Sequence, residues 1–151
     1  MRVYVMGGIT SPGMKGAISR IETFAKGMRP GVAKRLAPRI NERIRDMFTN
    51  ETDPYGRPWP PLKASTLRRK RNSPGGPIIL SRTFELGNSS YALYTGKRVV
   101  ITYGASGQYA DEGDSGRGNR PPRYLTPRFG IPKTWKADQA AALAEYEDTF
   151  K

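Results

Sequence analysis

The chain has 151 residues, of which 36% are hydrophobic, and it contains 17 glycines and 13 prolines, so we expect one domain with a modest core and much loop. Its 26 lysines and arginines against 13 aspartates and glutamates give a net charge of +13, which attracts polyanions such as nucleic acid, an anionic membrane face or an acidic protein. Cysteine and histidine are absent, which excludes disulfides, thiolate metal sites and imidazole acid-base chemistry.

The apolar run at the beginning of the chain is too short, and too soon interrupted by glycine, to be a signal peptide. No apolar run approaches the roughly 20 residues that span a bilayer. We therefore expect a soluble protein made in a cytoplasm, with no membrane partner. The first predicted elements are a weak strand over residues 3–6 and a helix over residues 15–28.

The main helix is predicted over residues 32–49. Val32, Leu36, Ile40 and Ile44 recur there at helical spacing, opposite several lysines and arginines. Pro38 marks either the true start of this helix or a bend in it, because its ring removes a helical hydrogen bond.

The second half of the chain contains shorter elements. They are a proline-rich loop over 53–63, a short helix capped by Ser65 or Thr66 and ending at Arg71, a β-hairpin over 90–104 that turns at Gly96-Lys97, a loop or arm over 107–124, and a last helix over 135–148 capped by Thr134. Together these elements predict an α+β fold, with a long helix packed on a small antiparallel sheet, extended arms and a C-terminal helix. We expect an N-terminal arm or helix over residues 1–30 and the main domain over 31–151, in a single domain overall.

The segment 53–63, here called the Pro-Trp segment, is stiffened by Pro58, Pro60 and Pro61. Each proline fixes its own φ and pushes the preceding residue toward extended geometry, so little entropy remains to be lost on docking. Trp59 can either stack on bases or plug a hydrophobic core, and a tryptophan between prolines favours the plug.

Four consecutive cations, Arg68 to Arg71, follow the Pro-Trp segment. They indicate either a phosphate-binding surface or a solvated helix end beside the C-terminal dipole, and the sequence leaves both interpretations open.

The carboxylates Asp111, Glu112 and Asp114 lack the spacing of a calcium loop. We expect them to form salt bridges with Arg117, Arg120 or Arg123. No phosphate-binding loop is present either, because no strand leads into a Gly-Lys-Ser/Thr at the start of a helix. The sequence thus predicts no catalytic, cofactor or metal site, and not an enzyme.

Four groups of residues resemble the phage virion morphogenesis family, which includes tail-completion proteins of contractile-tailed phages such as Mu and P2. They are the Pro-Trp segment with Ser65-Thr66, Ile79-Leu80 with Thr83 to Leu86 and Ser89-Ser90, Tyr109-Ala110, and Pro121 to Leu125. The resemblance covers about residues 32 to 150. It implies a structural subunit of the virion, assembled in the host cytoplasm, that ends or joins the tail.

The resemblance also implies a homo-oligomeric ring, expected to be a hexamer, that meets the tail tube and the head connector or neck proteins. We expect the Pro-Trp segment and the arm over 107–128 to make subunit contacts, and the basic residues to face acidic partner rings or DNA in the lumen. The residues expected at these contacts are Tyr55, Arg57, Trp59, Arg68, Arg69, Lys70, Arg71, Arg120, Arg123 and Tyr124.

Two other functions remain as alternatives. A basic nucleic-acid-binding module is favoured by the net charge and by aromatic residues near cations. A hydrolase using only carboxylates would depend on Asp111 or Asp114 and on a metal ion.

Overall fold

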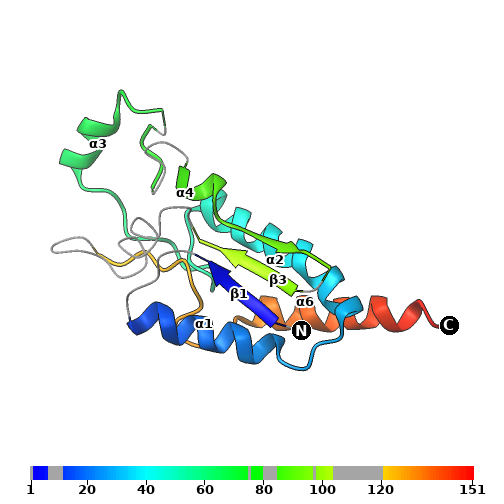
Figure 1. Cartoon of the computed structure of the whole chain (residues 1–151). Helices are drawn as coiled ribbons and strands as arrows, with labels where there is room; N and C mark the ends of the chain where they lie inside the picture. Colours follow the sequence, from blue (N-terminus) through cyan, green and yellow to red (C-terminus); the bar gives the residue numbers. More distant parts are fainter. Residues whose placement is uncertain (1, 7–11, 75, 80–84, 97, 104–120) are drawn as a thin grey trace.

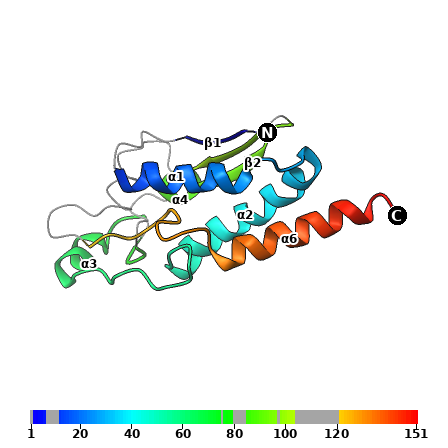
Figure 2. The same ribbon diagram turned by 90° about the horizontal axis from the view of Figure 1, so that it is seen from below.

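A computed structural model describes residues 2–6, 12–74, 76–79, 85–96, 98–103 and 121–151. Its elements, in chain order, are β1 (Arg2–Met6), α1 (Pro12–Ala25), α2 (Pro30–Asn50), α3 (Ala64–Lys70), α4 (Glu85–Asn88), β2 (Tyr91–Tyr94), β3 (Arg98–Thr102) and α6 (Lys133–Asp148). Figures 1 and 2 show the sheet on one side and α6 on the opposite side, with α1 and α2 between them. This is the predicted α+β architecture, with a long helix on a small sheet and a C-terminal helix.

Three strands of the described part form one sheet in the order β1-β3-β2. The predicted hairpin is confirmed: β2 runs antiparallel to β3, with Tyr91 opposite Thr102, and Gly96 in the turn has a φ of 84°. The other edge of β3 pairs with β1, in parallel, with Val3 opposite Val99. The sheet is therefore mixed, because a strand that returns to the sheet through helices arrives in parallel.

Helix α2 is the centre of the packing. It begins at Pro30, whose fixed φ suits the first helical position, so the interpretation of Pro38 as the helix start is wrong. Pro38 lies inside the helix on its exposed face, where the carbonyl group left without a backbone donor is open to solvent. The helix ends at Asn50, and its C-cap Glu51 is left-handed with a φ of 53°. The buried residues of α2 are Val32, Ala33, Leu36, Ala37, Ile40, Ile44 and Met47.

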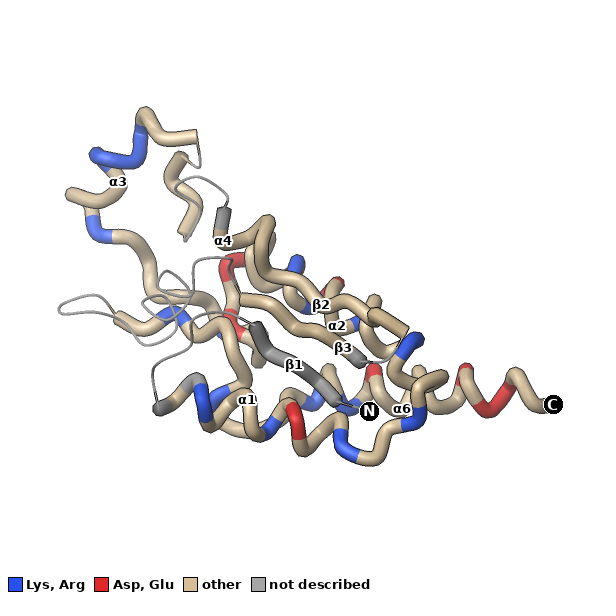
Figure 3. The backbone as a smooth tube through the Cα atoms, in the orientation of Figure 1, with Lys and Arg blue, Asp and Glu red and all other residues tan. Residues whose placement is uncertain are grey.

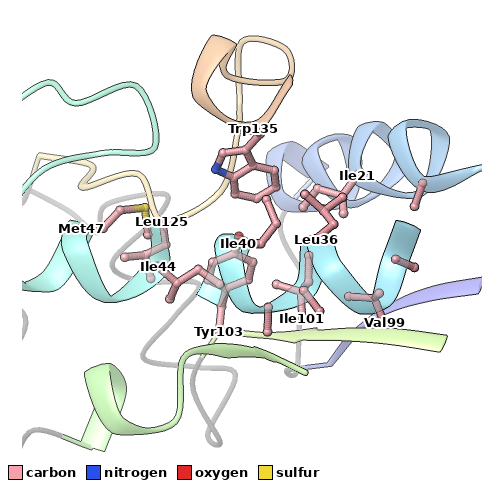
Figure 4. Close-up of a cluster of buried hydrophobic side chains, with 14 of the residues drawn as sticks. Ile21, Leu36, Ile40, Ile44, Met47, Val99, Ile101, Tyr103, Leu125 and Trp135 are labelled. Carbon is pink, nitrogen blue, oxygen red and sulfur yellow. The ribbon is translucent and has the colours of Figure 1, made fainter. Parts of the chain in front are cut away.

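Residues from all three layers meet in one hydrophobic core (Figure 4). Ile21 of α1, Ile101 of β3 and Trp135 of α6 are all buried there. A cavity of about 20 Å³ lies between these elements and has an apolar lining, so it has room for about one water molecule at most. Helix α1 therefore shares its core with α2, β3 and α6.

Two ion pairs between described residues join helix α6 to α2, Arg39 with Glu145 and Arg43 with Asp138. Arg43 donates two hydrogen bonds to the buried Asp138 carboxylate, from Nε at 2.8 Å and from Nη2 at 3.0 Å. This hydrogen bonding raises the pKa of Arg43 above its ordinary value. The helix begins at Lys133 after Pro132, so the predicted cap by Thr134 is wrong.

Helix α3 likewise begins one residue before the expected caps. Lys63 precedes it with no side-chain cap, so neither Ser65 nor Thr66 caps it. Within the described part of the chain, no helix combines the length and apolarity needed to cross a membrane.

Candidate interaction surface

The Pro-Trp segment folds into a tight loop around Asp53. One oxygen of this buried carboxylate accepts hydrogen bonds from the backbone N–H groups of Tyr55, at 2.8 Å, and Arg57, at 3.0 Å. Its second oxygen accepts a bond from Arg57 Nε at 2.7 Å. Gly56 lies between these residues with a φ of 80°, which glycine adopts without steric cost. Asp53 therefore fixes both the loop backbone and the direction of the Arg57 side chain.

Trp59 attaches the loop to the core. Its side chain is 4% exposed, its ring makes an edge contact with Phe48 at 5.6 Å between centroids, and its Nε1–H donates to the Tyr124 carbonyl at 3.1 Å. The interpretation of Trp59 as a core plug is confirmed. Trp59 was also expected to face a partner, and its burial shows that this expectation is wrong. The side chain supports the Pro-Trp segment from the inside.

Arg123 has the same inward role. Its guanidinium donates from Nε to the Pro60 carbonyl at 3.0 Å and from Nη2 to the Pro61 carbonyl at 3.3 Å, and the residue is buried. Arg123 was expected at a partner contact, and that expectation is wrong. Its side chain instead joins the segment around Tyr124 to the carbonyl groups of Pro60 and Pro61. The two segments, 62 residues apart in the chain, thus form one unit.

A group of rings and guanidinium groups lies on this unit, with Arg57 and Phe129 exposed and the others half-buried. Arg57 Cζ is 5.0 Å from the ring centroids of both Tyr55 and Phe129, and Arg128 Cζ is 5.4 Å from that of Tyr124. The Tyr124 and Phe129 rings meet edge to face at 5.4 Å. We call Tyr55, Arg57, Tyr124, Arg128 and Phe129 the aromatic-arginine cluster.

The Tyr55 hydroxyl group joins the two halves of the cluster. It accepts the Phe129 backbone N–H at 2.7 Å and donates to the Gly130 carbonyl at 2.6 Å. Burial raises the pKa of Tyr55 above its ordinary value of 10.0, because a desolvated phenolate is disfavoured. The hydroxyl therefore keeps its proton, and its donor role, at neutral pH.

Sequence reasoning found three members of the cluster, Tyr55, Arg57 and Tyr124, and missed Arg128 and Phe129. The only signal in the sequence was a large apolar side chain between Arg128 and Gly130, in a segment without periodicity. In the structure Phe129 is 64% exposed, and its ring contacts the Arg57 guanidinium and the Tyr124 ring.

The basic run lies elsewhere, on a lobe at one end of the molecule (Figure 3). Arg68, Arg69 and Arg71 are exposed there. Lys70 differs: it donates to the Ile78 carbonyl, and partial burial lowers its pKa below its ordinary value. Arg120 and the predicted salt bridges of Asp111, Glu112 and Asp114 lie outside the described residues.

Comparisons of the chain with protein-family models, with curated proteins and with solved structures found no match. The family resemblance therefore stays a prediction. In the described residues, no three or more histidines, cysteines, aspartates and glutamates gather as a metal site requires.

Proposed function

We propose that this chain is a non-enzymatic structural subunit of a phage virion, which acts in tail completion and head-tail joining as a ring at the head-proximal end of the tail. The observation that carries the proposal is the aromatic-arginine cluster, an exposed surface whose supports are buried. Asp53, Trp59 and Arg123 hold it from below.

Such a surface suits assembly because its conformation is set before a partner arrives. Tyrosine and arginine are enriched among the residues that dominate binding energy at protein interfaces. Side chains already ordered by stacking lose little entropy on binding, and each rotamer-rich side chain immobilised at an interface otherwise costs about 0.5–1.5 kcal/mol. Arg57 lies between Tyr55 and Phe129 and is bonded to Asp53, so its ordering is complete in the free subunit.

The net charge of the chain, +13, indicates the kind of partner, because such a chain attracts acidic surfaces. Exposed rings beside guanidinium groups fit an acidic protein surface with apolar contacts. Under the proposal, that surface belongs to the tail tube or to a head connector or neck protein.

The test is binding of purified chain to isolated tail tubes, measured by co-sedimentation. The double substitution Arg57→Ala and Phe129→Ala removes the exposed centre of the cluster and leaves its buried supports. We expect binding to weaken at least about 100-fold, since central interface residues each contribute roughly 2 kcal/mol or more. Leu93→Ala, an exposed apolar residue of β2, is the matched control and should bind normally. Unchanged binding of the double variant, or no binding of the parent chain, would contradict the proposal.

A second candidate is the nucleic-acid-binding module, which the exposed Arg68, Arg69 and Arg71 favour. It predicts tight DNA binding without other virion proteins and an affinity that falls steeply with salt concentration. In a plot of log affinity against log salt concentration, the slope should become shallower by about one for each arginine removed. A weak signal alone does not support it, because a chain with a net charge of +13 binds DNA non-specifically.

A further inference from the structure

Helix α3 is not buried by the part of the chain that the structure describes. None of its seven residues is buried, and a helix this short is marginal in water when nothing packs on it. Leu67 of α3 and the nearby Ile78 are both exposed large apolar residues. The chain around them, residues 61–79, contains five cations and no carboxylate: Lys63, Arg68, Arg69, Lys70 and Arg71. We call residues 61–79 the basic lobe.

The last turns of α6 have the opposite charge. Beyond Ala142 no residue is buried, and Leu143 and Phe150 are exposed, the latter at 73%. Glu147 lies one helical turn after Leu143, and Phe150 lies just beyond the end of the helix, where its ring contacts that of Tyr146 at 5.0 Å between centroids. Residues 143–151, here called the acidic end, contain the carboxylates Glu145, Glu147 and Asp148 and one lysine.

Both surfaces combine exposed apolar side chains with charge, and the two charges are opposite. Figures 1 and 2, two views related by a rotation about the horizontal axis, place α3 and the C-terminal end of α6 at opposite ends of the molecule. The two surfaces of one subunit are therefore too far apart to meet each other. The basic lobe of one copy and the acidic end of another can meet, and repetition of such a head-to-tail contact generates a ring or a filament.

We infer that the basic lobe of each copy docks on the acidic end of the next copy, and that this is the contact which builds the ring. The inference rests on the proposed function, because it supplies the interface between the subunits of the proposed ring. Leu67 and Ile78 meet Leu143 and Phe150 there, and their burial provides the affinity. Exposed charge pairs contribute only about 0–1 kcal/mol each, so they add little affinity. Their role is to set the orientation and the rate of association.

The test uses charge reversal at each surface of the full chain. The first variant, the lobe variant, carries Arg68→Glu and Arg69→Glu; the second, the end variant, carries Glu147→Lys and Asp148→Lys. Glu145 is left unchanged because it pairs with Arg39 of α2 and so helps to hold α6 in place, whereas Asp148 pairs with Lys151 inside the acidic end itself. Sedimentation velocity at physiological salt measures self-association. Each variant alone should self-associate at least about 10-fold more weakly than the parent, because like charges then face each other.

An equimolar mixture of the two variants should recover assembly, because the reversed lobe of one variant can then meet the reversed end of the other, and the unreversed lobe can meet the unreversed end. The matched control for the lobe variant, Arg45→Glu with Lys136→Glu, makes the same change in net charge as that variant at exposed positions away from both surfaces. It should assemble like the parent.

If the parent assembles and the single variants assemble equally well, or the mixture fails to recover, the inference is overturned while the ring stands. A parent chain that stays monomeric alone and on tail tubes overturns the ring as well. Loss of duplex DNA binding in the lobe variant, with self-association unchanged, would assign the basic lobe to nucleic acid instead.

Discussion

Replacement of Trp59 by phenylalanine tests whether this side chain holds the Pro-Trp segment on the core. The smaller ring keeps an aromatic contact with Phe48 and loses the Nε1–H that donates to the Tyr124 carbonyl at 3.1 Å. The substitution therefore loosens both segments that build the aromatic-arginine cluster and changes none of its exposed residues.

The cost has two parts. Loss of the hydrogen bond removes about 0.5–1.5 kcal/mol, and the smaller buried ring adds roughly 1 kcal/mol from lost contacts. Together they lower the free energy of unfolding by about 2 kcal/mol, which corresponds to a Tm lower by roughly 4–8 °C in a chain of this size. Trp59→Ala leaves a cavity and should cost about 3–5 kcal/mol.

Thermal and urea unfolding, followed by circular dichroism, measure these changes. Phe129→Ala is the matched control, because its ring is 64% exposed and its loss should change stability by less than about 0.5 kcal/mol. A Trp59→Phe variant as stable as the parent would refute the anchoring role. A variant that loses stability while its binding to tail tubes stays intact would show that the anchor does not preset the cluster.

Three further predictions concern single groups. Asp53→Ala leaves two backbone N–H groups and a guanidinium without their acceptor and should lower the free energy of unfolding by about 2–4 kcal/mol, measured by urea unfolding. Asp138→Asn weakens the bidentate pair with Arg43 and should cost about 1–2 kcal/mol in the same assay, less than for a fully buried pair because the Arg43 side chain is 41% exposed. The pKa of the Tyr55 hydroxyl group should lie above 10.0. The stability that this group provides is therefore fully present below pH 10.0 and is lost as the pH rises through its folded pKa. The measurement is the tyrosinate absorbance of the parent minus that of Tyr55→Phe as a function of pH, and a pKa at or below 10.0 would contradict the buried geometry.

Periodicity was sufficient to predict α2 and the hairpin, because each is a local pattern that the rest of the fold leaves intact. It could not predict the partner of β1. Five residues of alternating character have no preferred neighbour, and the pairing of Val3 with Val99 depends on how α1 and α2 carry the chain back to the sheet. The expected caps of α3 and α6 were wrong by two or three residues, because Lys63 and Pro132, not a serine or a threonine, precede these helices.

The candidate surface was predicted in part, for a related reason. Proline stiffness and the ring content of residues 53–63 were visible in the sequence, and so was the arm that begins at Pro121. What joins them, the bonds from Arg123 to the Pro60 and Pro61 carbonyls, is a contact between distant segments. Such contacts decide which residues are buried, so Trp59 and Arg123 were placed at the partner contact and Phe129 was not.

Negative-stain electron microscopy of particles assembled without this chain tests the proposed role most directly. The account predicts tails of abnormal length or heads without joined tails, and recovery of joined particles when the parent chain is supplied. Intact, infectious particles in its absence would contradict a role in tail completion.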